Sequence, residues 1–348
     1  MTQPQLGFRA GDKIPFCYGM AADQRYYSFE DQAGRPAVLI LAGAHPPAMT
    51  AELIYGFAAR AADFEALGVD ICVLAMVAAP GWPGIQVPEG LKLIHCMDAG
   101  LFNAAGGDPC VLLVDRAVRL ADAFAADPDA AVQGALAVAA ALPREAAADV
   151  SCPAPVLIRP AVFDLDLRRR LIAHFEAGAH EAGAIAGIDA DGHQINRVDA
   201  AKKRRRDLVI EPSEPIHAEV VHAIGTRLVP EIKKAFQAEV AHLDRVLIAR
   251  YDDDGGCFLR HRDNASAHLA WREFALSVNL NTGEYEGGRL AFPEYDDRLY
   301  NPPAGAGCVF SASLLHEATP VTRGSRYVLL TFLHSAGAEA KRLESLAA

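Results

Sequence analysis

Short apolar runs alternate with amphipathic stretches in the N-terminal part of the chain. The runs at residues 36–43, 69–76 and 111–115 are continuous rather than alternating, which predicts strands that are buried on both faces. Residues 48–67 and 130–142 have the spacing of amphipathic helices. Because strands and helices alternate, we expect a βαβ unit whose mainly parallel or mixed sheet is covered by helices.

The C-terminal part has a different pattern, with shorter strand-like runs separated by turn residues. Residues 257–263 follow the turn signal Asp254-Gly255-Gly256 and predict a strand, as do residues 308–311. Residues 326–333 are too uniformly apolar for a one-sided strand and predict a buried one.

One long helix is predicted between these two regions, over residues 213–240. Ser213 stands in the N-cap position, and apolar residues recur at helical spacing after it. Pro230 should break or kink this helix, because proline removes a backbone donor and clashes with the preceding turn.

The length of 348 residues and a change in pattern predict two domains. The Ala-rich stretch over residues 142–155 contains three prolines and is typical of a linker. We therefore expect an N-terminal domain over residues 1–148 and a C-terminal domain over residues 149–348. The predicted fold class is a two-domain chain of an α/β and an α+β unit.

Composition limits the classes of partner and compartment. A net charge of −11 argues against nucleic acid and anionic membranes as partners. Seven cysteines without framework spacing favour a reducing compartment, and we expect a cytoplasmic protein. The start of the chain lacks a basic region followed by an apolar run, and no stretch reaches 18 uninterrupted apolar residues, so we expect neither export nor membrane insertion.

Two polar segments precede the predicted long helix. Residues 189–199 are rich in turn formers and predict a flexible loop over a functional site. Residues 202–206, Lys-Lys-Arg-Arg-Arg, form the densest charge run of the chain. We interpret this run as a solvated loop or a salt-bridged face rather than a nucleic-acid patch, since the chain is acidic overall.

His261 and Asp263 are the first candidate metal ligands. On a strand, residues two apart point to the same face, so these two side chains can bind one ion. His242 and Asp244 repeat the spacing, but they lie at the end of a helix-like stretch and lack downstream partners at matching distance. We interpret His242 as a structural residue and His268 as a loop residue.

His316 completes the candidate set, and Arg326 follows it on the next predicted strand. Two imidazoles and one carboxylate leave coordination positions open, as non-haem Fe(II) oxygenases require. An arginine that opens a buried strand is costly unless an anion meets it, so Arg326 is the candidate for binding a dicarboxylic co-substrate. Arg323 is the rival anion binder, but it lies in the predicted turn.

The stretch over residues 251–332 resembles the catalytic core of the prolyl 4-hydroxylase-like Fe(II)/2-oxoglutarate dioxygenases. The matching strings, in chain order, are Arg250-Tyr251, His261-Arg262-Asp263-Asn264, Ala275 to Asn281, Tyr285 to Pro293, Pro302 to Gly305 and His316 to Tyr327. The resemblance implies a double-stranded β-helix, or jelly roll, with flanking helices. It also implies that His261, Asp263 and His316 bind iron and carry the catalysis, and that Arg326 and Tyr251 bind 2-oxoglutarate.

The resemblance implies Fe(II) as the metal, 2-oxoglutarate and O₂ as co-substrates, and ascorbate as a candidate reductant. Because Asp263 is intact, no coordination position is freed for halide, and hydroxylation of an unactivated C–H bond is favoured over halogenation. The substrate is either a prolyl or other residue of a protein or peptide, or a free amino acid or small metabolite. A non-catalytic iron and 2-oxoglutarate sensor that acts through the N-terminal domain is one alternative function, and a redox protein centred on the N-terminal domain is another.

The N-terminal domain resembles peroxiredoxins of the thioredoxin fold. The matching strings are Gly11 to Pro15, the apolar run over residues 36–43, and Pro46 to Leu53. Peroxiredoxins carry the reactive cysteine where this chain has Leu53, so we expect no peroxidase activity. Cys17, Cys72, Cys96 and Cys110 are interpreted as buried structural thiols. The role that remains is interaction, which includes homodimerisation through this domain.

Overall fold

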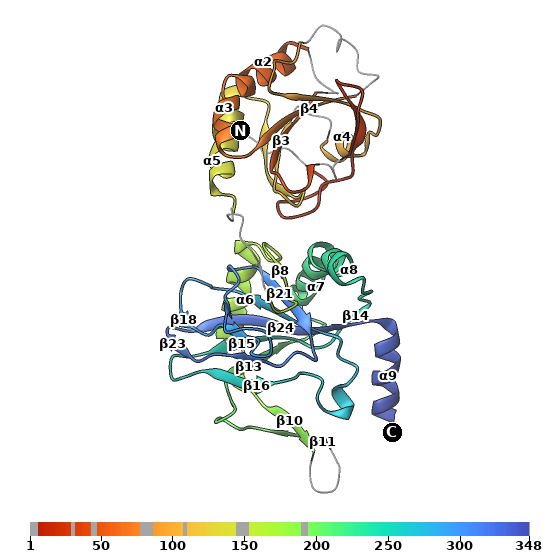
Figure 1. Cartoon of the computed structure of the whole chain (residues 1–348). Helices are drawn as coiled ribbons and strands as arrows, with labels where there is room; N and C mark the ends of the chain where they lie inside the picture. Colours follow the sequence, from red (N-terminus) through yellow and green to blue (C-terminus); the bar gives the residue numbers. More distant parts are fainter. Residues whose placement is uncertain are drawn as a thin grey trace. The chain divides into compact units, whose positions relative to one another are not determined.

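The computed structural model describes residues 6–28, 32–42, 47–76, 86–106, 110–143, 153–188 and 194–347 (Figure 1). The chain divides into two compact units, Met1–Ala147 and Ala148–Ala348.

The N-terminal unit contains a mixed sheet with the strand order β2-β1-β5-β4-β3-β6-β7. Strands β3, β4 and β5 are parallel to one another, and the remaining pairings are antiparallel. The strands are β1 (Tyr18–Ala21), β2 (Tyr26–Ser28), β3 (Ala37–Leu41), β4 (Asp70–Met76), β5 (Lys92–Cys96), β6 (Cys110–Val114) and β7 (Leu120–Ala125). The helices are α2 (Pro47–Ala58), α3 (Ala61–Ala66), α4 (Gly100–Ala104) and α5 (Pro128–Ala141).

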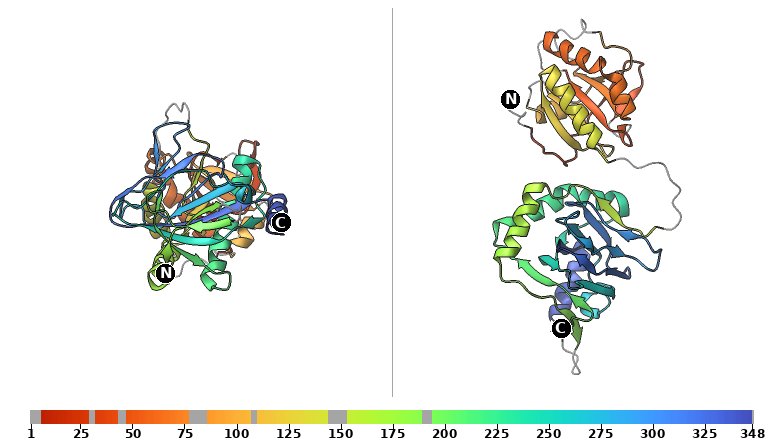
Figure 2. Two further views of the ribbon diagram at one scale, coloured as in Figure 1. Left: turned by 90° about the horizontal axis from the view of Figure 1, so that it is seen from below. Right: turned by 90° about the vertical axis from the view of Figure 1, so that its left-hand side faces the viewer.

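Both faces of this sheet are covered, as its uniformly apolar central strands require. Val38 and Ile40 of β3 pack with α2, α3 and α5 on one face, while Leu39 packs with α4 on the other. Helices α2 and α5 lie side by side (Figure 2). The three predicted apolar strands and the second helix are confirmed.

The predicted helix over residues 48–67 is divided in the structure. α2 ends at Ala58, and α3 begins at Ala61 with Arg60 as its N-cap. The Arg60 side chain pairs with Asp63 in the first turn of α3, and the acidic Asp63 stabilises the N-terminus of this separate helix. Strands β1, β2, β5 and β7 were not predicted, because they are short or carry partly exposed residues without clear alternation.

The C-terminal unit contains two antiparallel sheets that face each other. The larger has the order β8-β21-β17-β24-β15-β13-β9, with β14 paired to β24, and the smaller has the order β12-β16-β22-β19-β20. The strands of the larger sheet are β8 (Leu157–Arg159), β9 (Glu181–Ala182), β13 (Arg206–Ile210), β14 (His242–Leu243), β15 (Val246–Tyr251), β17 (Phe274–Asn279), β21 (Gly307–Ser311) and β24 (Arg326–His334). Those of the smaller sheet are β12 (Lys203–Arg204), β16 (Cys257–His261), β19 (Leu290–Ala291), β20 (Leu299–Tyr300) and β22 (His316–Ala318).

Two further strand pairs and four helices complete the described part of this unit. β10 (Ile185–Ile188) and β11 (Gln194–Arg197) form a hairpin, and β18 (Glu286–Gly287) pairs with the distant strand β23 (Val321–Arg323). The helices are α6 (Leu165–Ala177), α7 (Pro215–Arg227), α8 (Val229–Phe236) and α9 (Ala336–Ala347), and a short 3-10 turn spans Ala267–Leu269.

Apolar residues on both faces of the larger sheet account for this arrangement. On the inner face, Ala249 and Val328 pack against Phe292 of the smaller-sheet side. On the outer face, Ile248 and Leu329 pack against α6, α7 and α8, whose apolar stripes they cover. The inner space between the two sheets is where the predicted ligands lie.

The predicted long helix over residues 213–240 needs correction at both ends and in the middle. The N-cap is Glu214 rather than Ser213, because Pro215 takes the first helical position. The break falls at Leu228, and Pro230 then lies in the first turn of α8. α8 ends at Phe236, where Gln237 has a left-handed conformation.

Candidate active site

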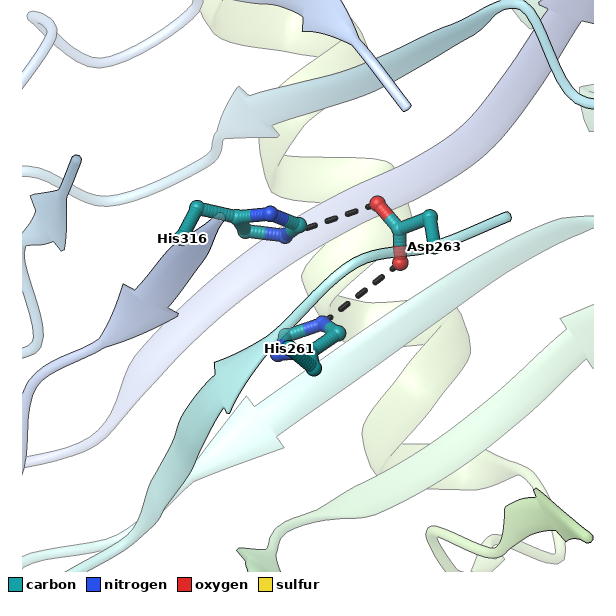
Figure 3. A group of neighbouring side chains, drawn as sticks. All are labelled: His261, Asp263 and His316. Atoms are coloured by element: carbon teal, nitrogen blue, oxygen red, sulfur yellow. Dashed lines mark ion pairs between the residues drawn. The ribbon is translucent and has the colours of Figure 1, made fainter. Parts of the chain in front are cut away.

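Strand pairing in the smaller sheet brings the three predicted metal ligands together (Figure 3). His261 ends β16 and His316 begins β22, and the two residues are direct partners across the antiparallel ladder. Asp263 lies two residues beyond His261, where its backbone N–H donates to the carbonyl of Ala312 (3.0 Å). One donor atom from each of the three residues lies within 4.8 Å of the others.

Backbone carbonyls fix the orientation of both imidazoles. Nδ1 of His261 lies 2.8 Å from the carbonyl oxygen of Leu259, and Nδ1 of His316 lies 2.9 Å from that of Leu314. A carbonyl oxygen only accepts, so Nδ1 carries the proton and Nε2 keeps its lone pair. The two Nε2 atoms lie 3.5 Å and 3.4 Å from the carboxylate oxygens of Asp263, as the dashed lines in Figure 3 mark.

The protonation states of this cluster suit a metal site. Burial alone would raise the pKa of Asp263, but the hydrogen bond that His261 donates when protonated and the charge of protonated His316 outweigh burial and lower that pKa. Burial lowers the pKa of His316, because the imidazolium loses more free energy of hydration than it gains from its attraction to Asp263. A carboxylate and a neutral imidazole are the forms that bind a cation.

Aromatic rings surround the cluster and limit the access of water. The ring of Phe258 stacks on His261 with centroids 3.5 Å apart, and that of Phe310 lies 4.6 Å from His316. Two imidazole nitrogens and one carboxylate in such surroundings fit the donor set of a non-haem Fe(II) centre. His242 lies apart from this set: it pairs with β24, and its ring stacks on His334 at 5.5 Å. His268 lies in the 3-10 turn.

Arg326 opens β24 and is only 2% exposed. Its Nη2 donates to Oδ1 of Asn279 at 2.9 Å, while its Nε is buried without a hydrogen-bond partner. Among the carboxylates that the structure describes, none forms an ion pair with it. A buried guanidinium in this state is stabilised by an anion that enters from the cavity.

Tyr251 is the direct cross-strand partner of Arg326, and the two side chains are adjacent. The guanidinium carbon of Arg326 lies 5.2 Å from the centre of the Tyr251 ring. The phenol oxygen accepts a hydrogen bond from Nη1 of Arg205 at 2.8 Å.

Arg323, the rival anion binder, points away from this region. Its side chain is 74% exposed and pairs with Glu286 of the neighbouring strand β18 at 2.6 Å. The geometry therefore favours Arg326 over Arg323 for binding a co-substrate carboxylate.

Of the two expectations for the basic run over residues 202–206, a solvated loop or a salt-bridged face, the structure favours the second, because Lys203 and Arg205 pair with Asp207. Lys203 is 5% exposed, and the Arg205 side chain is 7% exposed, whereas Lys202, Arg204 and Arg206 are exposed. Lys203, Arg205 and Asp207 alternate along β12 and β13, so they share the inner face. That two-residue spacing, with an acid as its third member, was the sequence signal that could have identified Arg205.

A cavity of about 910 Å³ connects these groups. Its lining contains the three candidate ligands, and also Arg326, Tyr251 and Arg205. It extends to Ile185 of the β10–β11 hairpin and to Trp271 on the opposite side. The predicted loop over residues 189–199 lies partly outside the described residues, while residues 194–197 form β11 rather than a loop.

No helix within the described ranges of the chain is long and apolar enough to cross a membrane.

Comparison with known proteins gives a family for the C-terminal unit. The family model of the 2OG-Fe(II) oxygenase superfamily matches residues 246–334. A PKHD-type hydroxylase of Synechococcus sp. (strain JA-2-3B'a(2-13)) is 32% identical over 169 residues, which cover 47% of this chain and 68% of that protein. The matched segments span between 11% and 70% of the relatives' own lengths.

Two solved structures are similar to parts of the chain. A Pseudomonas putida prolyl-4-hydroxylase is 21% identical, has a TM-score of 0.40 and covers 52% of this chain and 94% of its own. The peroxidoxin BcpB of Mycobacterium tuberculosis, a neighbour of the N-terminal part, is 16% identical, has a TM-score of 0.34 and covers 39% of this chain and 99% of its own.

Proposed function

Through its C-terminal unit the chain belongs to the 2OG-Fe(II) oxygenase superfamily, and on this premise we propose that it hydroxylates an unactivated C–H bond with Fe(II), 2-oxoglutarate and O₂. One observation carries the proposal. A single cavity contains three converging metal donors and, on the facing sheet, a buried guanidinium that has no carboxylate partner among the described residues.

In this proposal His261, Asp263 and His316 hold Fe(II) through Nε2, a carboxylate oxygen and Nε2. The bound metal supplies O₂ activation, with 2-oxoglutarate as the electron source. Overall, 2-oxoglutarate, O₂ and substrate R–H give succinate, CO₂ and R–OH. The Nδ1 contacts with Leu259 and Leu314 keep the Nε2 atoms of both imidazoles directed at the metal position during the reaction.

The larger sheet binds the co-substrate. The guanidinium of Arg326 pairs with the distal carboxylate of 2-oxoglutarate, and the Tyr251 hydroxyl donates to the same group. Both side chains are buried, so this pairing forms away from bulk water and is correspondingly strong. Phe258 and Phe310 keep water from the metal.

The substrate is a prolyl or other residue of a protein or peptide, with a free amino acid or small metabolite as the alternative. A cavity of about 910 Å³ exceeds what 2-oxoglutarate fills, which leaves room for a substrate side chain above the metal donors. Ascorbate is the proposed reductant. For the N-terminal unit we propose an interaction role, including homodimerisation, since Leu53 stands in place of a reactive cysteine.

Replacement of two metal ligands tests the function. The His261→Ala, Asp263→Ala variant should lose succinate formation by more than about 100-fold, since loss of a hydrogen-bond partner of a ligand alone costs about 10–100-fold. The matched control is His242→Ala, which removes an exposed imidazole from β14 and should leave turnover unchanged. Full 2-oxoglutarate consumption by the double variant would refute the proposed function.

A further inference from the structure

Arg205 contacts Tyr251 at its hydroxyl and lies close to its ring. None of the roles above includes Arg205. We propose that Arg205 is a positioning residue that directs the Tyr251 hydroxyl proton toward the carboxylate of 2-oxoglutarate. This inference rests on the proposed function.

Arg205 is held rigidly enough to act in this way. Its Nε lies 2.8 Å from Oδ1 of Asp207, and its Nη2 donates to Oδ2 of the same carboxylate at 3.1 Å. The third arm of the fork, Nη1, donates to the Tyr251 oxygen at 2.8 Å. The guanidinium carbon also lies 5.6 Å from the centre of the Tyr251 ring. A planar fork with two hydrogen-bonded nitrogens, and with Nε in ion-pair contact with Asp207, has little freedom left.

The consequence for Tyr251 follows from donor and acceptor counting. A guanidinium has no acceptor, so the phenol oxygen must accept in the contact with Arg205. The single hydroxyl proton then points elsewhere, and the Arg326 guanidinium lies beside the same ring, 5.2 Å from its centre. Tyr251 and Arg326 thus present two donors to one place in the cavity, which is the arrangement that a carboxylate needs.

Direct binding of the anion by Arg205 is the less favoured role. Arg205 has a carboxylate partner in Asp207, which it shares with Lys203, whereas Arg326 has only the neutral Asn279. A guanidinium whose charge is matched attracts a second carboxylate weakly. Arg205 therefore influences the co-substrate through the hydroxyl that it contacts.

Binding of 2-oxoglutarate to the Mn(II)-loaded full-length protein, measured by calorimetry, tests this inference without turnover. The proteins are wild type, Arg205→Met, Tyr251→Phe and the double variant. Each single replacement should raise the dissociation constant about 10- to 100-fold, as loss of one hydrogen bond to a charged group does. The double variant should match Tyr251→Phe to within about twofold, because Arg205 has no hydroxyl left to orient.

Two controls separate this role from a structural one. Arg206→Met removes an exposed charge from the neighbouring position of the same basic run and should leave the dissociation constant unchanged. Arg205→Lys keeps a cation beside Asp207 if the Met variant does not fold, and Lys lacks the fork that reaches both partners. The effect of Arg205→Lys on the dissociation constant should likewise vanish in the Tyr251→Phe background.

Multiplicative effects of Arg205 and Tyr251 replacement, with wild-type binding intact, would overturn the inference and leave the proposed function standing. A wild-type protein that binds no 2-oxoglutarate would overturn both.

Discussion

At the scale of single residues, the site depends on buried arginines that differ in whether a carboxylate neutralises their charge. Arg326 has a neutral amide partner and a free Nε, whereas Arg205 has its own carboxylate. A buried guanidinium without an anion costs folding free energy, which binding of an anion returns. Arg326 is therefore the residue where co-substrate affinity and stability are most closely linked.

Replacement of Arg326 should act on co-substrate binding. Arg326→Ala should weaken binding of 2-oxoglutarate by about 2–5 kcal/mol, since a desolvated guanidinium–carboxylate pair is lost. Calorimetry on the Mn(II)-loaded protein measures this. Arg323→Ala removes the exposed arginine at the end of β23 and is the matched control. An unchanged affinity in Arg326→Ala would move the anion-binding role to another residue.

Lys203 gives a pH-dependent contribution to stability. Burial, followed by the charges of Arg205 and Arg245, lowers its pKa from 10.5 to about 7, against the opposing attraction of Asp207. Between pH 7 and 10.5 the unfolded chain then binds more protons than the folded one, so this residue makes stability rise with pH across that window. Below about pH 7 both states are protonated and the contribution is constant.

Lys203→Met removes this rise. The free energy of unfolding of the variant, relative to wild type, should therefore fall by about 1–3 kcal/mol between pH 7 and 9, since one pH unit corresponds to at most about 1.4 kcal/mol. Urea titrations at several pH values measure the difference. A difference that stays constant over this range would show that Lys203 does not titrate there.

At the scale of elements, strand register determines which side chains meet. The β16–β22 ladder pairs His261 with His316, and the β15–β24 ladder pairs Tyr251 with Arg326. Each ladder thus contributes one half of the site, and a slip of one residue would turn the side chains to the opposite face. The tight turn between β18 and β19 supports the second half, because it packs on the Arg326 side chain.

Substitution of Gly288 tests whether that turn supports the Arg326 side chain. Its φ is +59°, and a Cβ there would lie 2.9 Å from Cδ of Arg326 and 2.9 Å from Val321. Gly288→Ala should therefore destabilise the fold by about 1–3 kcal/mol and weaken 2-oxoglutarate binding, because Arg326 must move. Thermal unfolding and calorimetry measure the two effects.

Gly283→Ala is the matched control for this turn. Gly283 also has a positive φ, +103°, but a Cβ there meets nothing within 4 Å. This variant should lose stability through backbone strain alone and bind 2-oxoglutarate as wild type does. Equal affinities in the two glycine variants would contradict the packing argument.

At the scale of the whole molecule, the two units differ in the chemistry that they offer. The N-terminal unit has Leu53 buried on α2 where a peroxiredoxin has its reactive cysteine. Cys17, Cys72 and Cys96 are buried, and burial raises the pKa of Cys72 to about 12. Thiols in this state are poor nucleophiles, because the thiolate is the reactive form.

We expect the native protein to consume no peroxide through these thiols. Cys17, Cys72, Cys96, Cys257 and Cys308 should be unreactive toward an aromatic disulfide reagent until denaturant is added. Absorbance of the released thiolate, with peptide mapping, measures which cysteines react. Peroxide turnover that disappears when Cys17, Cys72 and Cys96 are replaced by Ser would contradict the expectation.

Local patterns were enough to predict the long apolar strands and the ligand set. His261 and Asp263 share a strand face by their spacing alone, and an arginine at the start of an apolar run indicates a buried charge that needs an anion. These inferences depend on periodicity over a few residues, which the sequence contains directly. The limit that the intact carboxylate of Asp263 places on the chemistry came instead from the resemblance to the dioxygenases.

Only the tertiary structure decided which distant residues meet and which charges are buried. Partnering of His261 with His316, and of Tyr251 with Arg326, depends on register between strands far apart in sequence. The same holds for Arg205, since the sequence alone left its run of five basic residues as either a solvated loop or a salt-bridged face, and its contact with Tyr251 depends on the pairing of β13 with β15. A sequence determines local periodicity, whereas burial of a polar group depends on non-local packing, and that is the physical reason for the division.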